Sequence, residues 1–187
     1  MGKIYQMVDE KNRAWHAGMS YWRGIKDINS YSIGIELENS GHHINFEAYS
    51  EVQTNQLIKL IKHIKKKHDI SNFGILGHSD VSYMRKIDPG EKFPWNKLAY
   101  KNISYQPKIK KLPDNETVDE FDIKLYYRKL RKIGYGIDIK KFNNKNSRMF
   151  TNVTKSFQMH YQQNFVTGYP NKETHSIIDQ YLKDFID

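Results

Sequence analysis

The residues best suited to chemistry lie in one stretch of this 187-residue chain, where an aspartate follows a histidine by ten positions. His78 belongs to the segment Gly77–Asp80, and Asp88 belongs to Arg85–Gly90, with Lys86 two positions before it. Imidazole and carboxylate groups bind Zn²⁺, and a catalytic zinc usually takes three protein ligands and leaves one position for water. The sequence therefore predicts a zinc site formed in part by His78 and Asp88, with no obvious third ligand.

Three segments are predicted to be strands that bring these residues together. Tyr31–Glu38 alternates between apolar and polar residues, which predicts one buried face and one face that carries Glu36. Phe73–Gly77 is a short apolar run that would deliver His78 at its carboxyl end, where open α/β sheets commonly build their sites. Lys3–Val8 is read as a further short strand.

Helical patterns occupy much of the remaining chain. Ser50–Gln53 matches a capping box and opens a helix that runs to about Lys67. Shorter or later helices are expected near 95–98, 119–134, 149–164 and 172–185. The fold class is therefore α/β, with a mixed central sheet flanked by helices in residues 1–102, a proline- and lysine-rich linker at 103–118, and a small three-helix module at 119–187.

Composition excludes several classes of protein. No apolar run is long enough for a membrane span, and the first residues lack the apolar stretch of a signal peptide. The absence of Cys excludes disulfides and thiolate metal ligands. The net charge of +9 is spread along the chain, so no nucleic-acid partner is expected. The dense run at Lys62–Lys67 is read as the solvated face of a helix, with attraction to an anionic polymer left open.

Four motifs in order give the chain a family resemblance: Ala14–Gly18, Ser32–Glu38, Gly77–Asp80 and Arg85–Gly90. Together, over roughly residues 2–100, they resemble the zinc-dependent N-acetylmuramoyl-L-alanine amidases of the AmpD-like type, which are relatives of peptidoglycan recognition proteins. The resemblance implies hydrolysis of the amide bond between N-acetylmuramic acid and L-alanine, with peptidoglycan or a muropeptide as the partner.

The resemblance also implies roles for individual residues. His78 and Asp88 match two of the three zinc ligands of the family. Glu36 matches the acidic residue that takes the proton of the attacking water and passes it to the leaving amine. Lys86 matches the cation that stabilises the developing oxyanion. The substrate groove would be lined by Trp15, His16 and Ala17.

The first zinc ligand of these amidases has no counterpart in the chain. In the family it is a His on a strand that precedes the segment matching Ala14–Gly18, and an early helix follows that strand. We therefore expect unpaired backbone and exposed apolar surface beside Ile33 and Ile35. Two interpretations of this departure stay open. The chain is one part of a longer protein, with the amino-terminal portion recorded elsewhere, cleaved or supplied by another chain, or it is the product of a shortened or split gene and binds zinc poorly or not at all. The functional alternative to a zinc amidase is a protein that binds peptidoglycan without cutting it. His16 or His42 could replace the ligand in principle, but nothing in the sequence favours either.

The last third of the chain has a looser resemblance of its own, to the three-helix peptidoglycan-binding module often joined to such amidases. The residues that carry it are Tyr126–Leu130, Ile133–Gly136, Thr154–Gln158, Asn164–Gly168 and Thr174. The module would hold the enzyme on the cell wall and raise the local substrate concentration. An unrelated helical bundle is the alternative. A wall-binding module favours the periplasm over the cytoplasm, whereas the choice between intact wall and anhydro-muropeptide, and the oligomeric state, stay open.

Overall fold

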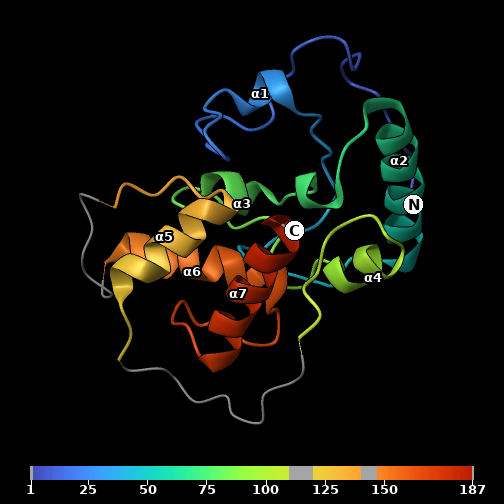
Figure 1. Ribbon diagram of the computed structural model, residues 1–187. Helices are drawn as coiled ribbons and strands as arrows, with labels where there is room; N and C mark the ends of the chain where they lie inside the picture. The colour runs from blue at the N-terminus through green and yellow to red at the C-terminus, as the bar shows by residue number, and fades with distance from the viewer. Residues whose placement is uncertain (1, 110–119, 140–146, 187) are drawn as a thin grey trace.

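Helices dominate the computed structural model, which describes residues 2–109, 120–139 and 147–186 (Figure 1). The element that carries His78 is the short helix α3, which lies between the N-terminal segment and the last three helices (Figure 1). In chain order the elements are α1 (Ile28–Tyr31), α2 (Glu51–His68), the 3₁₀ helix η1 (Asn72–Gly74), α3 (His78–Ser82), α4 (Trp95–Tyr100), α5 (Ile123–Ile133), α6 (Arg148–Tyr161) and α7 (Lys172–Ile186).

The predicted helices are confirmed wherever the structure describes them. Helix α2 begins after Ser50, whose hydroxyl oxygen accepts a hydrogen bond from the backbone N–H of Gln53 at 3.2 Å. The Gln53 amide turns away and donates to the carbonyl of Glu38 at 2.9 Å, so only half of the capping box forms. The apolar stripe of α2 is buried as expected, through Leu57, Ile58, Ile61 and Ile64.

The three predicted strands are not formed, and the mixed central sheet is not confirmed. The described residues contain only two isolated bridges, which join Trp22 to Ile25 and to Tyr135. Strand pairing requires a neighbouring backbone that takes up N–H and C=O groups, and the described residues place none beside Tyr31–Glu38. Phe73–Gly77 instead satisfies part of its backbone locally in η1, where the Gly74 N–H donates to the carbonyl of Ser71.

The Tyr31–Glu38 segment is only partly covered by the described residues. Its alternating apolar residues do not form a buried face, since Tyr31 is 75% exposed and Ile35 37% exposed. Lys3–Val8 is also on the surface, with Met7 88% exposed. The expected exposed apolar surface is therefore present beside Ile35.

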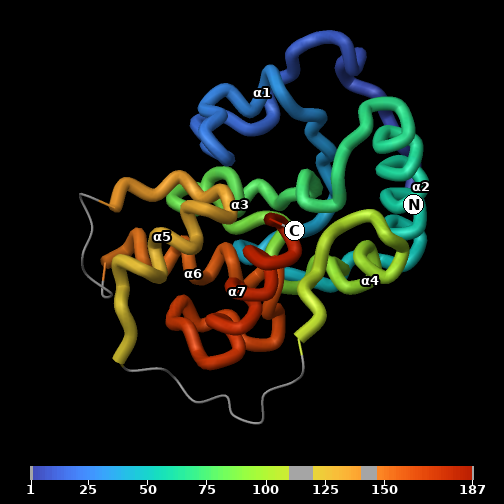
Figure 2. Tube along the Cα trace, in the orientation of Figure 1, coloured from blue at the N-terminus to red at the C-terminus, as the bar shows by residue number. Residues whose placement is uncertain are grey.

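Two apolar clusters stabilise the fold. The main cluster packs α5, α6 and α7 against α3 and against Ala17, Trp22 and Ile28 from the N-terminal segment. The second lies between α2 and α4 and also contains Phe93 and Ile103. In Figure 2 the chain can be followed from the N-terminal segment to α3 and on to α5–α7, which together surround the main cluster.

Contacts cross the predicted boundary between the two halves of the chain. Trp22 pairs with Tyr135 through backbone and ring edge, with ring centroids 5.1 Å apart. Ile103 and Ser104, at the start of the predicted linker, are buried rather than solvated. The rest of that linker, from residue 110, lies outside the described residues. The division into domains at 1–102 and 119–187 stays a prediction.

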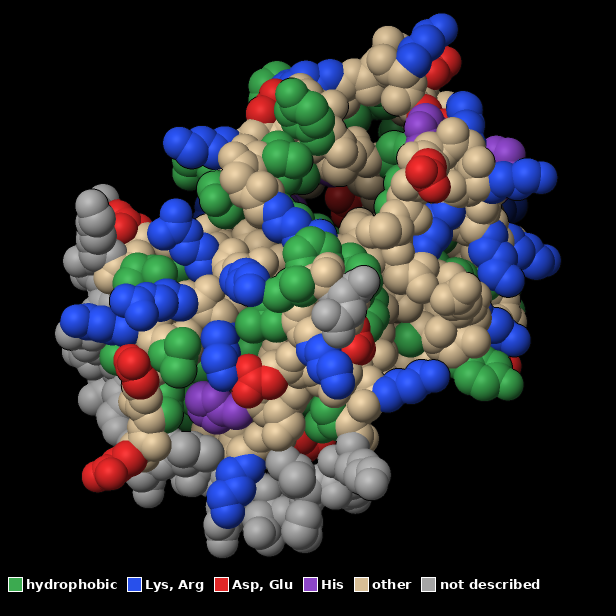
Figure 3. Space-filling view, in the orientation of Figure 1, with side chains coloured by type: hydrophobic (Ala, Val, Ile, Leu, Met, Phe, Trp, Pro, Cys, Tyr) green, Lys and Arg blue, Asp and Glu red, His purple; other side chains and the backbone are tan. Residues whose placement is uncertain are grey.

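Positive charge is distributed over the molecular surface. Figure 3 shows Lys and Arg side chains spread across the visible face. Within the run Lys62–Lys67, three lysines are exposed, but Lys65 is partly buried and donates to the carbonyl of Ile103 at 2.9 Å. No helix in the described part of the chain has the length and apolar character needed to cross a membrane.

Candidate functional site

The site is built around the start of α3, which the sequence motif Gly77–Asp80 encodes. Gly77 is the N-cap residue, and its backbone N–H donates to the carboxylate of Asp80 at 2.7 Å. The segment that carries Asp88 is hydrogen-bonded to the same helix, because the N–H of Ser79 donates to the carbonyl of Asp88 at 2.9 Å. These two bonds bring the predicted zinc ligands His78 and Asp88 onto adjoining backbone segments.

The His78 ring lies between the carboxylate of Asp88 and the backbone carbonyl of Ala17. Its Nδ1 is 3.0 Å from Oδ2 of Asp88, and its Nε2 is 3.1 Å from the carbonyl oxygen of Ala17. A carbonyl oxygen can only accept a hydrogen bond, so Nε2 carries a proton and donates it. Nδ1 and the carboxylate then face each other as two acceptors unless a cation, either a proton or a metal ion, lies between them.

The pKa of Asp88 is lowered, although opposing influences act on it. Partial burial acts to raise this pKa, but the hydrogen bond and charge of His78 and the charge of Lys86 outweigh burial and lower it. The Asp88 carboxylate is still 55% exposed, whereas the His78 side chain is only 17% exposed. The pair therefore presents an ionised carboxylate at the surface and an oriented imidazole behind it.

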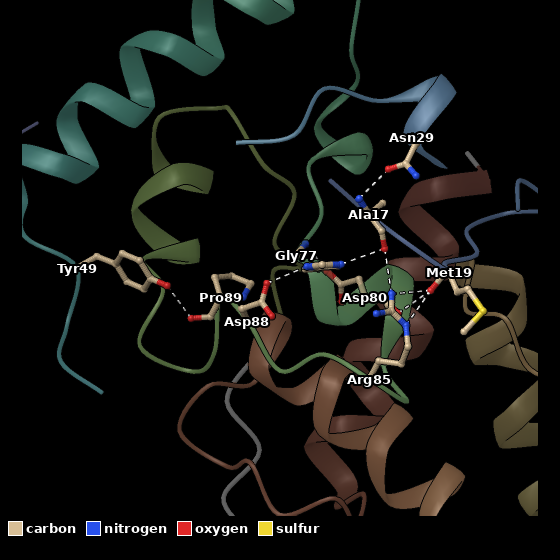
Figure 4. A network of polar contacts seen from close by, with 11 residues as sticks. Ala17, Met19, Asn29, Tyr49, Gly77, Asp80, Arg85, Asp88 and Pro89 are labelled. Carbon is tan, nitrogen blue, oxygen red and sulfur yellow. Dashed lines mark hydrogen bonds and ion pairs between the residues drawn. The ribbon is translucent and has the colours of Figure 1, made fainter. Parts of the chain in front are cut away.

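The backbone of Ala17, whose carbonyl orients His78, is held from two sides (Figure 4). Arg85 donates to the Ala17 carbonyl at 3.0 Å and to the Met19 carbonyl at 2.8 Å. The buried side chain of Asn29 accepts from the N–H groups of Ala17 and His16 at 2.8 and 3.0 Å. Ala17 thus contributes to the site through its backbone, since its side chain is buried in the main cluster.

His16 lies beside the site without joining the pair. Its Nε2 is 2.8 Å from the hydroxyl of Ser32. Burial lowers the pKa of His16, and a backbone hydrogen bond with Ala14 and, less strongly, the charge of Glu36 partly counteract this shift. A Cβ at Gly34 would lie 2.5 Å from the His16 ring, so this glycine is what lets the two segments approach.

The remaining predicted site residues lie around the pair. Lys86 is partly exposed and close enough to Asp88 to influence its pKa. Glu36 is exposed, and among the described residues no hydrogen bond or ion pair joins it to His78 or Asp88. Trp15 is 84% exposed, and the guanidinium carbon of Arg13 lies 3.9 Å from its ring centroid.

A complete set of protein zinc ligands is not assembled in the residues that the structure describes. No group of three or more His, Asp or Glu side chains lies close enough there to hold a metal ion. His78 and Asp88 supply two donors of the right type, and neither His16 nor His42 adds a third. The ring of His42 instead pairs with Glu91 at 2.9 Å.

Sequence reasoning assigned no role to several residues that shape the site. Arg85 and Asp80 lie inside the quoted motifs, and the position of Asp80 in the first turn of a helix was a usable sign of a cap. Asn29 carried no signal in the sequence. His160 reaches Asp80 across 80 positions, a separation at which local patterns give no information.

Comparison with known proteins identifies the family to which the chain is similar. A family model described as N-acetylmuramoyl-L-alanine amidase matches residues 1–91. The N-acetylmuramoyl-L-alanine amidase AmiD of Escherichia coli strain K12 is 33% identical over 98% of this chain and 68% of its own length. The 1,6-anhydro-N-acetylmuramyl-L-alanine amidase AmpD of Haemophilus influenzae is 41% identical over 51% of this chain and 50% of its own length.

Solved structures extend the match to nearly the whole chain. AmiD from E. coli, solved with anhydro-N-acetylmuramic acid-L-Ala-D-gamma-Glu-L-Lys, superposes with a TM-score of 0.86 and 31% identity over 98% of this chain and 73% of that one. AmpDH3 from Pseudomonas aeruginosa, in complex with anhydromuramic pentapeptide, gives a TM-score of 0.83 and 28% identity over 98% and 74%. The chain belongs to the N-acetylmuramoyl-L-alanine amidase family, and it spans about half to two thirds of the curated relatives it matches. The family resemblance read from the four motifs is thereby confirmed.

Proposed function

We propose that this protein hydrolyses the amide bond between N-acetylmuramic acid and L-alanine in muropeptides or peptidoglycan. The observation that carries the proposal is the His78 imidazole, oriented by the Ala17 carbonyl with its Nδ1 3.0 Å from the Asp88 carboxylate. Family membership supports the same reaction, since the solved relatives include AmiD and AmpDH3 with anhydromuramyl peptides bound.

The spacing and chemistry of two donor atoms in this site suit zinc. Two donors bound to one tetrahedral zinc lie roughly 3.3 Å apart, which is close to the 3.0 Å between Nδ1 of His78 and Oδ2 of Asp88. Zinc-binding histidines commonly donate their other ring N–H to a backbone carbonyl, as His78 does to Ala17. When bound, zinc polarises a carbonyl and makes water acidic enough to attack it at neutral pH. His78 and Asp88 would hold the ion, and its remaining positions are left to donors outside the pair.

The other residues of the site act on the substrate. Lys86 offers an ammonium group beside Asp88, where it would stabilise negative charge on the scissile carbonyl. Glu36 is assigned to proton transfer between the attacking water and the leaving amine. Trp15 presents an exposed ring, backed by the Arg13 guanidinium, on which the muropeptide would lie next to His16.

Zinc content and amide hydrolysis test the proposal together. The purified chain should bind about one zinc, and it should release peptide from a purified muropeptide. The variant His78→Ala should lose both properties. His63→Ala, which removes an exposed histidine of α2, is the matched control and should keep both. A chain that binds no more zinc than His78→Ala and releases no peptide would refute the proposal.

One observation favours a second candidate, a protein that binds peptidoglycan without cutting it. The described residues gather only two zinc donors, and two ligands alone give a weak and poorly defined site. Sedimentation with purified wall sacculi distinguishes the two. Binding to sacculi with no peptide release at saturating zinc would select the binding protein, whereas peptide release would exclude it.

The helical part is proposed to retain the protein on the cell wall, which would place its work in the bacterial envelope, in the periplasm rather than the cytoplasm. Helices α5, α6 and α7 form where the loose motif predicts them. Tethering of this kind raises the effective substrate concentration without any new contact at the catalytic site. Loss of sacculus binding in a variant with an altered helical surface, at unchanged activity on soluble muropeptide, would support the assignment.

A further inference from the structure

A buried polar cluster lies directly behind the zinc pair, centred on Asp80. The Asp80 side chain is 1% exposed and two residues away from His78 in the same short helix. Its Oδ2 accepts from the backbone N–H of Gly77 at 2.7 Å and from Nδ1 of His160 at 2.7 Å. Its Oδ1 accepts from the hydroxyl of Tyr135 at 2.8 Å. A buried carboxylate is stable only when its oxygens are hydrogen-bonded, and here the partners come from both halves of the chain.

Helix α3 depends on these bonds for its position. It contains only five residues, and a helix this short is not stable on its own because nucleation costs more than so few hydrogen bonds return. Asp80 caps its first turn and ties it to α6 and to the loop after α5. Since His78 is the first residue of α3, the direction of its ring is set by the same contacts.

His160 is held firmly enough to act as the anchor. Its side chain is 2% exposed, and its ring stacks on Trp95 with centroids 3.6 Å apart. Because the Asp80 carboxylate accepts, the hydrogen lies on Nδ1 of His160. The other ring nitrogen of His160 is buried and has no hydrogen-bond partner among the described residues, so this ring acts on Asp80 through the Nδ1 hydrogen bond.

A residue just beyond the end of α6 is also hydrogen-bonded to the segment that follows Asp88. Gln163, two residues beyond α6, donates its side-chain N–H to the carbonyl of Phe93 at 2.7 Å and also to that of Glu91. Those carbonyls lie three and five residues after Asp88. His160 and Gln163 lie in one stretch of four residues. Between them they hydrogen-bond to both segments that carry a predicted zinc ligand.

We propose that His160 and Gln163 are positioning residues for the zinc pair, so that the helical part of the chain is a component of the catalytic site as well as a wall-binding element. His160 acts through Asp80 on His78, and Gln163 acts through the loop on Asp88. The inference rests on the proposed function for its meaning, but the geometry that it predicts can be measured in the protein without zinc.

The main test compares two substitutions of His160. His160→Phe keeps a flat ring but removes the donor to Asp80, whereas His160→Asn places an amide N–H near the position of Nδ1. The control is Gln158→Leu, because Gln158 is buried in the same helix and bonds only within residues 167–169. The readout is the two-bond ¹H–¹⁵N spectrum of the His78 ring in the zinc-free full-length chain.

In the native chain the His78 ring should give one set of signals with Nε2 protonated, as the Ala17 carbonyl requires. His160→Phe should shift these signals toward a mixture of tautomers, and His160→Asn should restore them. Gln158→Leu should lower the melting temperature and leave them unchanged. Unchanged His78 signals in folded His160→Phe would overturn the proposal.

Gln163→Ala decides the question if His160→Phe does not fold, since Gln163 is only partly buried and lies beyond the helix end. It should shift the Nδ1 signal of His78, which senses the Asp88 carboxylate, and an unchanged signal would overturn the proposal. In protein that binds zinc, both variants should also weaken affinity about 10–100-fold, as loss of supporting contacts does in other sites. Failure of the native chain to bind zinc would count against the proposed function and leave the His78 readout intact.

Discussion

Removing the hydroxyl of Tyr135 should destabilise the protein more than removing any comparable buried hydroxyl in the same cluster. The hydroxyl donates to Oδ1 of Asp80 at 2.8 Å, and Ser156 is the other neighbour of that oxygen at the longer distance of 3.5 Å. Burial and the charge of Asp80 raise the pKa of Tyr135 well above its ordinary value, so the hydroxyl keeps its proton at any working pH.

A hydrogen bond to a charged group contributes about 1.5–3 kcal/mol to the free energy of unfolding. For a chain of this length, each kcal/mol shifts the melting temperature by roughly 2–4 °C, so Tyr135→Phe should melt about 3–12 °C lower. The control is Tyr126→Phe, because Tyr126 is equally buried and its hydroxyl bonds only the neutral hydroxyl of Thr154 at 3.1 Å. That substitution should cost about 0.5–1.5 kcal/mol.

Thermal and urea unfolding, followed by circular dichroism, measure both substitutions. The reasoning requires Tyr135→Phe to lose clearly more stability than Tyr126→Phe, because only the first leaves a buried carboxylate oxygen without a short hydrogen bond. Equal losses would show that Asp80 does not depend on the Tyr135 hydroxyl.

Three further changes test other parts of the site. Asn29→Ala leaves two backbone N–H groups of the site without their acceptor, so it should lower the free energy of unfolding in urea by about 1–3 kcal/mol. The control Asn55→Ala removes an exposed side chain and should cost nothing, so equal losses would contradict this expectation. Gly90→Ala should destabilise more than Gly41→Ala, since both have positive φ but only a Cβ at Gly90 meets an aromatic ring carbon, at 2.7 Å; equal melting temperatures would refute the clash. The lowered pKa of Asp88 means that its stabilising contribution is complete above its ordinary value of 3.8 and is lost as pH falls through the folded-state pKa. Asp88→Asn should flatten the acid limb of the stability curve, and an unchanged limb would count against this assignment.

The parts of the fold that the sequence predicts are those encoded locally. Helix α2 has its cap at Ser50 and its apolar stripe within 18 residues, so the pattern alone places both ends. The segment Tyr31–Glu38 carries an equally clear alternation but forms no strand. A strand is completed by a partner elsewhere in the chain, and alternation records only that one face suits burial.

The residues of the candidate site also divide into those that local sequence patterns predict and those that they do not. His78 and Asp88 could be identified because the motif fixes their spacing and the structure brings them to 3.0 Å. The residues that hold them in place could not be identified, since Asn29 and His160 act through one or two hydrogen bonds to other segments of the chain. A buried polar contact of this kind leaves no periodic trace in the sequence.

The reach of Arg23 across the chain has a consequence for biosynthesis. Its backbone N–H donates to the carbonyl of Gly134, its guanidinium to the carbonyl of Ile133, and a second guanidinium nitrogen to the hydroxyl of Tyr181, 158 positions away. Trp22, beside it, is buried in the cluster that α7 completes. The N-terminal segment therefore cannot complete its packing until α7 has been synthesised, so translation must pass Tyr181 before this core can close. Contacts of such long range slow folding and leave apolar surface open to chaperones and proteases in the interval.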